Sequence, residues 1–371
     1  MKIKKKILSL ILVSALAITS LVGCSSSNTA SSSQASSQQQ QSSENQDAET
    51  VKFTDSAGRE VEIPKNIERI APTGALAQIV LFSVSPDKMV GISTEWSDDA
   101  KEILTDKYAN LPVFGQMYGT SDLNTEALAA ADPQVIIDIG ELKEGAKEDL
   151  DSMQEQLGIP VIFVEATLES MPDCYTTLGK ILGEEEKAQS LSDYCKNTYD
   201  TTVETMKKID DDDKVDVLYC AGDTGTSVIG KGSFHAEIID LLANNVAELD
   251  NPSSKGTGDE VSLEQIYMWD PDVIIFAPQS IYSTVGEDKD WQKVEAIKDG
   301  DYYESPDVPY NWMGMPPSVN RYMGMIWLSE TLYPDEFDYD LKEKTKEYYK
   351  LFYNADLTDE QYENITKNAI K

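Results

Sequence analysis

The sequence predicts an α/β protein in which one helix–strand unit occurs twice. Residues 124–137 and 262–275 align without a gap at an offset of 138 residues, which superposes Glu126 on Glu264 and one Asp-Pro pair on the other. Stretches typical of strands and of helices also alternate on both sides of a strand-poor middle. Such alternation is typical of parallel strands joined by right-handed crossovers. We therefore expect two related α/β lobes with a helical segment between them.

Each copy of the repeat is expected to form a helix, a stop and a buried strand. Asn124 and Ser262 suit the N-cap position. The glutamate two residues later then lies in the first helical turn, where the helix dipole favours a carboxylate. Asp-Pro ends the helix, and the Val-Ile-Ile run that follows suits a strand covered on both faces. Chance similarity at a common type of helix-to-strand junction is the weaker explanation, because the agreement has no gap.

The N-terminus has the features of a secreted, lipid-modified chain. Lysines at positions 2 and 4–6 precede an apolar run over residues 7–21 that is too short to span a membrane as a folded anchor. Leu21-Val22-Gly23-Cys24 resembles the bacterial lipobox, whereas the alternative is an ordinary signal peptide with a chance cysteine. We expect a signal peptide over 1–23, lipid attachment at Cys24 and a Ser/Gln-rich tether over 24–50, which has too few apolar residues to fold.

The first lobe is expected over residues 51–183. Residues 53–61 are typical of a hairpin whose turn is at Ala57-Gly58. A short strand at 68–71, a helix at 75–84, a strand at 88–92, the first repeat copy and a strand at 158–164 then follow.

A connecting helix is expected over 184–210, because residues 169–208 lack strand signals and contain few helix breakers. A helix longer than average between two lobes is a natural rigid connector. The second lobe, over 211–334, comprises a strand at 214–220, a helix at 234–242, the second repeat copy and a helix up to Leu332. Residues 335–371 are predicted to form an acidic, Tyr-rich helical extension.

Charge and cysteine content narrow the range of partners. The formal net charge is -35, which argues against nucleic acid or an anionic membrane surface as a partner. The cysteines after Cys24 show no CxxC spacing, so they indicate neither a zinc site nor a disulfide framework. A bridge between Cys174 and Cys195 and a pair of buried reduced thiols both remain open.

The hairpin segment 53–61, the lipobox, the two glutamate-containing copies and the mid-chain helix follow one another in a specific order. Together they resemble the substrate-binding lipoproteins of ABC importers, in the branch that takes up iron–siderophore, haem and cobalamin. The resemblance covers roughly residues 50–371. It implies two Rossmann-like lobes joined by a single long α-helix, the class III periplasmic-binding-protein architecture, with the ligand in the cleft between the lobes. It also implies a lipid-anchored position outside the cytoplasm, on the outer face of the bacterial cytoplasmic membrane or in the periplasm.

Glu126 and Glu264 match the family's docking acids, one in each lobe, which contact arginines of the membrane permease. Stabilisation of the helix dipole is the alternative role, and both roles are compatible. In the docking role, charge complementarity would steer association and fix the register of the complex.

Candidate ligand-binding residues follow from topology, because ligands of open α/β sheets bind beyond the carboxyl ends of the strands. Trp96 and Trp312 are expected on the rim of the cleft rather than in the core. Tryptophan and methionine offer broad contact to a large, partly apolar ligand. Arg321 is equally suited to a ligand carboxylate and to an acid of the protein. The full set of predicted ligand-binding residues is Thr73, Gly74, Trp96, Met117, Tyr118, His235, Tyr282, Trp312, Met313 and Arg321.

His235 is the only histidine, and ligand contact and a purely local role at a helix start both remain open for it. A single histidine argues against the multi-histidine cages of the zinc and manganese binders with similar architecture. We therefore expect no metal held by protein side chains.

The predicted function is capture of an iron chelate, a siderophore or haem, for delivery to an ABC permease. A corrinoid ligand such as cobalamin is the alternative within the class, and an extracytoplasmic hydrolase is the alternative from another class. No Gly-x-Ser-x-Gly elbow supports a hydrolase, and Gly232 stands where a Walker A loop needs a hydroxyl residue. An adhesin or sensor would explain the tether but not a ligand cleft. No catalytic residue and no resident cofactor are expected.

Overall fold

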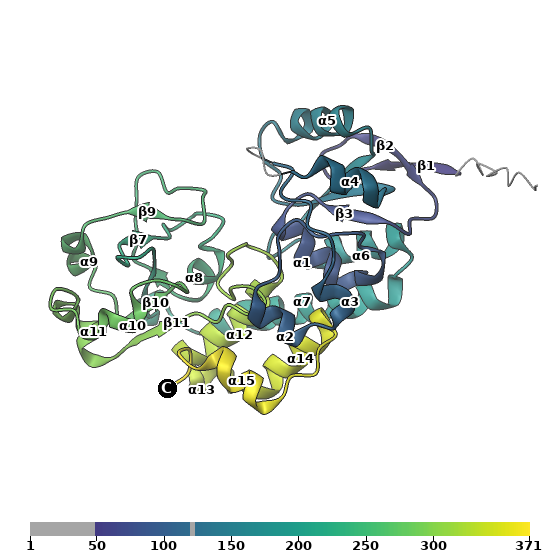
Figure 1. Cartoon of the computed structure of the whole chain (residues 1–371). Helices are drawn as coiled ribbons and strands as arrows, with labels where there is room; N and C mark the ends of the chain where they lie inside the picture. The colour runs from purple at the N-terminus through teal and green to yellow at the C-terminus, as the bar shows by residue number, and fades with distance from the viewer. Residues whose placement is uncertain (1–48, 119–122) are drawn as a thin grey trace, which may run out of the picture. The chain divides into compact units, whose positions relative to one another are not determined.

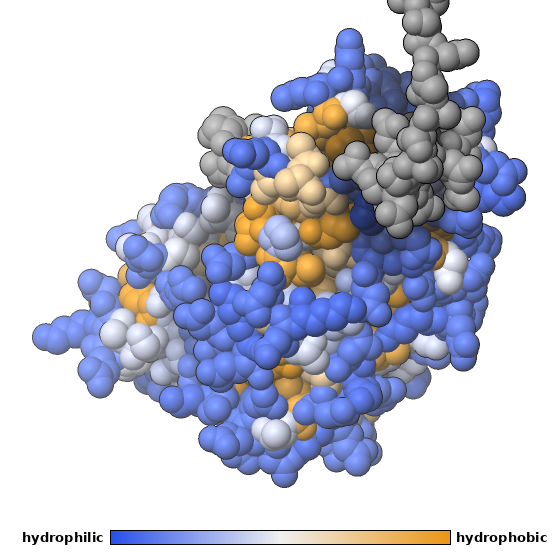
Figure 2. Space-filling model, turned by 45° about the vertical axis from the view of Figure 1, so that its right-hand side comes forward, coloured by the Kyte–Doolittle hydropathy of each residue, from blue (hydrophilic) through white to orange (hydrophobic). Residues whose placement is uncertain are grey.

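The computed structural model describes residues 49–118 and 123–371 (Figure 1). The predicted signal peptide, the lipobox with Cys24 and most of the predicted tether lie outside the described residues. The described residues belong to one compact unit. Within the two described ranges, no helix combines the length and apolar character needed to cross a bilayer. Figure 2 shows that hydrophilic residues cover most of one face, in keeping with the formal charge of -35.

The first lobe contains a hairpin and a parallel sheet. Strands β1 and β2 pair antiparallel, with Phe53 opposite Val61, and form the predicted hairpin. Strands β3, β4 and β5 form a three-stranded parallel sheet in the order β3-β4-β5. The elements of this part of the chain are β1 (Thr50–Thr54), β2 (Glu60–Pro64), β3 (Ile70–Pro72), α1 (Ala75–Val84), η1 (Pro86–Lys88), α2 (Asp98–Ile103), α3 (Asp106–Ala109), α4 (Thr125–Ala131), β4 (Val135–Gly140), α5 (Ala146–Leu157), β5 (Val161–Glu165) and α6 (Met171–Leu182).

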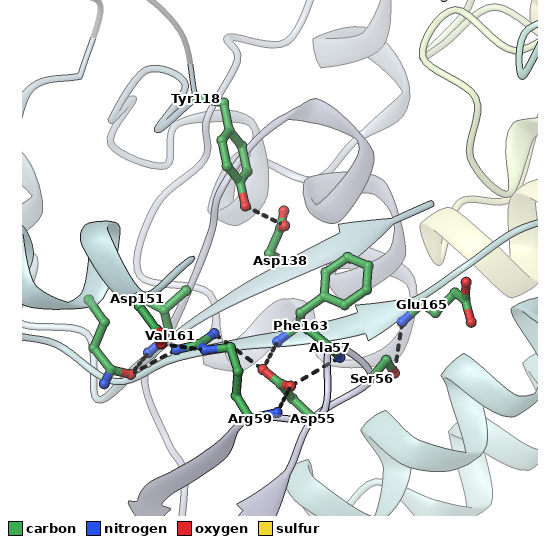
Figure 3. Close-up of polar contacts among 11 residues, drawn as sticks. Asp55, Ser56, Ala57, Arg59, Tyr118, Asp138, Asp151, Val161, Phe163 and Glu165 are labelled. Carbon is green, nitrogen blue, oxygen red and sulfur yellow. Dashed lines mark hydrogen bonds and ion pairs between the residues drawn. The ribbon is translucent and has the colours of Figure 1, made fainter. Parts of the chain in front are cut away.

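A buried ion pair fastens the hairpin to β5 (Figure 3). The carboxylate of Asp55 accepts hydrogen bonds from the backbone N–H groups of Ala57 at 3.0 Å, Arg59 at 2.9 Å and Phe163 at 3.3 Å. The Arg59 guanidinium reaches the same carboxylate at 3.2 Å and Asp151 of α5 at 2.8 Å. The Asp-Ser-Ala-Gly-Arg turn therefore joins three segments of the lobe.

Helix α7 (Glu185–Met206), of 22 residues, follows α6 and precedes the second sheet. That sheet has the order β11-β10-β6-β7-β9, with β8 also paired to β6. Strands β8, β10 and β11 run parallel within it, whereas β7 and β9 pair antiparallel. The elements after α7 are η2 (Asp211–Asp213), β6 (Asp216–Ala221), β7 (Ser227–Val228), α8 (Glu237–Leu242), β8 (Asn244–Asn245), β9 (Asp259–Glu260), α9 (Leu263–Trp269), β10 (Val273–Phe276), α10 (Tyr282–Val285), η3 (Trp291–Lys293), α11 (Glu295–Asp299), β11 (Tyr302–Glu304), α12 (Asn320–Leu332), α13 (Pro334–Phe337), α14 (Leu341–Tyr353) and α15 (Asp359–Thr366).

The two repeat copies adopt the same local structure in separate sheets. Asn124 caps α4 and Ser262 caps α9, each by accepting a hydrogen bond from the N–H group three residues later. Each helix ends on an aspartate in the left-handed conformation, with φ of 49° at Asp132 and 46° at Asp270. Strand β4 follows in the first sheet and β10 in the second.

The C-terminal helices belong to the core of the protein. Helix α14 packs against α1 and α12, and its residues Tyr348, Tyr349 and Phe352 are fully buried. Helix α12 also packs against α7 and α8. The helical character predicted for residues 335–371 is therefore found, but this segment is integrated with the first lobe's α1.

Candidate functional site

A cavity of about 490 Å³ lies where loops of the first sheet face loops of the second-sheet region. Its size is within the range of small-molecule sites, which are commonly 300–1,000 Å³. Residues after β3 and β4 form one side, as the carboxyl-end rule requires. Its lining includes Thr73, Gly74, Ala75, Leu76, Gln116, Tyr118, Asp138, Glu141, Lys143, Asp149, Phe234, His235, Pro316 and Pro317.

Asp138 on β4 is the polar centre of the first-lobe side. Its carboxylate accepts a hydrogen bond from the hydroxyl group of Thr73. It accepts a second, of 2.6 Å, from the hydroxyl group of Tyr118, whose ring points toward it in Figure 3. Burial raises the pKa of the Asp138 carboxyl, whereas the two hydroxyl donors oppose that rise. Burial, and next the charge of Asp138, also raises the pKa of the Tyr118 phenol. Tyr118 therefore remains a neutral hydrogen-bond donor.

The N-terminus of α1 opens into the same cavity. Gly74 is its N-cap and provides no side-chain acceptor for the first-turn N–H groups. Gly74, Ala75 and Leu76 all line the cavity. The N–H groups of the first helical turn have no partner inside the helix, and together with the helix dipole they favour oxygen atoms of a ligand.

The second-lobe side combines an aromatic ring with a histidine. Phe234 and His235 line the cavity just before α8, and His235 Nδ1 lies 3.0 Å from the carbonyl oxygen of Gly314. Burial lowers the pKa of His235 below 6.5, with smaller contributions from the charges of Arg321 and Lys143. At neutral pH the imidazole is therefore uncharged.

Arg321 lies behind this wall and is fully buried. Its guanidinium forms an ion pair with Glu237 and lies 4.8 Å from the ring centre of Phe234. Of the two roles predicted for Arg321, the structure shows the pairing with an acid of the protein.

The predicted site residues do not all lie together in the structure. Thr73, Gly74, Tyr118 and His235 line the cavity together. Met117 lines a neighbouring cavity that shares Gln116, Tyr118 and Asp149 with it. Tyr282 lies elsewhere: it packs on Phe276 and Tyr302 and contacts the carbonyl oxygen of Asn368.

Trp96, Trp312 and Met313 are core residues, with exposed fractions of 3%, 1% and 1%. This corrects the expectation that both tryptophans lie on the cleft rim. The Trp96 ring packs edge-on against Phe82 and Tyr310. The backbone of Trp312 lies directly against Gly324 of α12, where a Cβ atom would come within 2.0 Å of the Trp312 carbonyl oxygen.

Asp138 and Phe234 were absent from the predicted set. Asp138 carries a readable signal, because it is the one charged residue in the otherwise apolar strand β4, Val-Ile-Ile-Asp-Ile-Gly. A charged side chain inside a strand buried on both faces needs polar partners and often marks a site.

Glu126 and Glu264 lie outside the cavity at equivalent places. Each is in the first turn of its repeat helix, α4 or α9, and each is exposed. Neither makes an ion pair with any residue that the structure describes. Both carboxylates are accessible to a partner protein.

Comparison with known proteins identifies the family. The family model described as "Periplasmic binding protein" matches residues 77–309, whereas none of the curated proteins matches. An ABC transporter solute binding protein of Sulfurospirillum deleyianum superposes with a TM-score of 0.77 at 28% identity, covering 85% of this chain and 99% of that one. A periplasmic solute binding protein of Veillonella parvula gives 0.71 and 27%, covering 86% and 98%.

The molybdate periplasmic binding protein MolA of Haemophilus influenzae, at 19% identity, shares the fold with a TM-score of 0.67 and coverage of 83% and 99%. These relatives are binding proteins rather than enzymes. The predicted two-lobed fold is confirmed, as is the predicted type of protein, an extracytoplasmic solute-binding component of ABC importers. The chain belongs to the periplasmic binding protein family.

Proposed function

We propose that this protein captures an iron chelate, a siderophore or haem, in the cavity beside α1 and delivers it to the transmembrane subunits of an ABC permease. The observation that carries the proposal is the cavity itself. At about 490 Å³ it suits a chelate rather than a bare ion. It also joins apolar walls to the uncapped end of a helix.

The walls suggest how a chelate would bind. Leu76, Phe234 and the two prolines at 316 and 317 offer apolar contact to the ligand's organic frame. The first-turn N–H groups of α1 would donate to ligand oxygen atoms, which surround the iron in an oxygen-donor chelate, whereas the Tyr118 hydroxyl already donates to Asp138. A corrinoid ligand is the second candidate, because the same apolar walls would suit its ring edges.

Delivery would depend on two further features. Lipid on Cys24 would hold the protein at the outer face of the membrane, and a second acyl chain or further contact is needed for stable anchoring. Glu126 and Glu264 would then meet cationic residues of the permease, one in each lobe. In this arrangement residues 51–183 and 211–334 act as the two lobes, and 184–210 as the connector between them.

The experiment is ligand binding by the soluble part of the chain. Residues 49–371 are titrated with ferric chelates, haem and cobalamin, and binding is followed by quenching of tryptophan fluorescence and by calorimetry. Saturable binding of at least one iron chelate is expected. Absence of a saturable response to every compound would overturn the proposal.

A matched pair of variants locates the site. Ala75→Phe fills the cavity beside α1, whereas Ala129→Phe places the same side chain on the exposed surface of α4. The first should abolish binding and the second should leave it unchanged. Equal affinities in both variants would show that the ligand binds elsewhere.

A further inference from the structure

The acidic groups of the cavity restrict the charge of its ligand. Among the described residues that line it, the carboxylates are Asp138, Glu141 and Asp149, and the basic side chains are Lys143 and His235. His235 is uncharged at neutral pH, because burial lowers its pKa. Among the lining residues that the structure describes, Lys143 is therefore the only one with a full positive charge.

The strongest cation near the cavity is already neutralised. Arg321 lies behind Phe234 in an ion pair with Glu237 and has no exposed surface. An anionic ligand that recruited Arg321 would have to leave Glu237 as an unpaired, half-buried carboxylate. Leaving such a charge without a partner is strongly unfavourable.

Glu141 and Asp149 give the cavity its negative charge, because both are exposed and neither makes an ion pair with a described residue. Even when Asp138 is protonated, the two negative charges of Glu141 and Asp149 exceed the single positive charge of Lys143. The N-terminus of α1 favours electronegative atoms. A ligand that reaches it also comes close to Asp138, because the hydrogen bond from Thr73 holds this carboxyl group near the helix N-cap. Neutral ligand oxygens satisfy the α1 amides without placing a net negative charge next to three carboxyl groups.

We infer that the cavity selects iron chelates that are uncharged or cationic and discriminates against anionic ones. This inference rests on the proposed function and narrows its ligand class. Repulsion by Glu141 and Asp149 is the selective element, a case in which specificity comes from disfavouring the wrong ligand. Trianionic catecholate chelates, and haem with its two propionates, fall in the disfavoured group.

The test uses one ligand scaffold in three charge states. A linear ferric tris-hydroxamate with a terminal amine is used as the free ammonium form, as the uncharged N-acetyl form and as the N-succinyl form, which carries a carboxylate. We expect the ammonium and acetyl forms to bind at least about tenfold more tightly than the succinyl form, with the difference shrinking at high salt. A ferric tris-catecholate and haem extend the series.

Variants separate local from general charge effects. The double variant Glu141→Gln, Asp149→Asn should strengthen binding of the succinyl form, so that the three forms bind with nearly equal affinity. The control Glu144→Gln, Glu148→Gln removes the same number of charges from exposed positions that do not line the cavity, and it should keep the preference. Equal effects of the two double variants would overturn the inference, because they would show that total charge alone sets the preference.

The outcomes also distinguish the two proposals. Tight binding of anionic chelates, equal to or above that of the other forms, would overturn this inference and leave iron-chelate binding intact. Failure of every chelate to bind, whatever its charge, would overturn the proposed function and this inference with it.

Discussion

Tyr118 donates a hydrogen bond of 2.6 Å to Asp138 and thereby links the loop before the first repeat to the strand within it. Thr73, at the end of β3, donates to the other carboxylate oxygen. One partly buried carboxyl group thus holds together three segments that line the cavity. Its protonation is coupled to the stability of the fold.

Asp138→Asn should change how stability depends on pH. Burial raises the pKa of Asp138 in the folded protein, so the folded state binds this proton more tightly than the unfolded chain. That contribution to stability is complete below the unfolded pKa of about 3.9 and is lost as the pH rises through the folded pKa. The free energy of unfolding of the variant minus that of wild type, measured by denaturant unfolding, should therefore increase as the pH is raised.

Asp149→Asn is the control for this experiment, because Asp149 lines the same cavity but is exposed. It should show no comparable change with pH. A variant-to-wild-type difference at Asp138 that is constant across the pH range would contradict the expectation.

Arg59→Met should destabilise the protein by roughly 3 kcal/mol, because it leaves the buried carboxylate of Asp55 without its charged partner. The matched control is Lys52→Met, since the Lys52–Glu60 pair lies on the same hairpin with both side chains 67% exposed. Exposed pairs contribute at most about 1 kcal/mol. Urea titration of both variants measures the two losses of unfolding free energy. Equal losses would show that the buried Asp55–Arg59 pair contributes no more to stability than an exposed pair.

Gly324→Ala should cost about 1–3 kcal/mol or more, because its Cβ atom would lie 2.0 Å from a backbone oxygen of Trp312. Gly74→Ala is the control for stability. Gly74 has an extended backbone, and a Cβ atom added there would meet open space. The unfolding free energy of the Gly74→Ala variant should therefore differ from that of wild type by no more than about 0.5 kcal/mol. Thermal or urea unfolding of the pair tests the packing of α12 on the 312 loop.

Charge reversal at the two repeat helices should separate transport from ligand binding. Glu126→Lys combined with Glu264→Lys should abolish ligand-stimulated ATPase activity of the reconstituted permease while leaving soluble ligand affinity unchanged. Glu62→Lys with Glu287→Lys changes one exposed acid in each half of the chain away from these helices and should retain the activity. Loss of ligand affinity in the first pair would point instead to a role in the binding site.

Ligand binding should change the radius of gyration only slightly. Helix α7 runs without a break over 22 residues between the two sheet regions, and a continuous helix resists hinge closure. Small-angle X-ray scattering of residues 49–371 with and without ligand measures this. A large contraction on binding would contradict a rigid connector.

The features that the sequence predicted best are local. The repeat was readable because the cap residues Asn124 and Ser262 and the Asp-Pro stops act within a few residues of their own positions. The carboxyl-end rule led to Thr73, Gly74, Tyr118 and His235, which the structure brings together around one cavity; their role in ligand binding stays a prediction. The burial of Trp96 and Trp312 depends on packing with distant segments, which no local pattern encodes.

The contact of α14 with α1 has a biosynthetic consequence. The helix whose first turn faces the cavity is supported by residues 341–353 from near the end of the chain, including Tyr353, whose ring lies 6.1 Å from that of Phe82. A nascent or truncated polypeptide lacking this segment leaves that flank of α1 uncovered. Complete packing of α1 therefore requires a segment that is synthesised long after the helix itself.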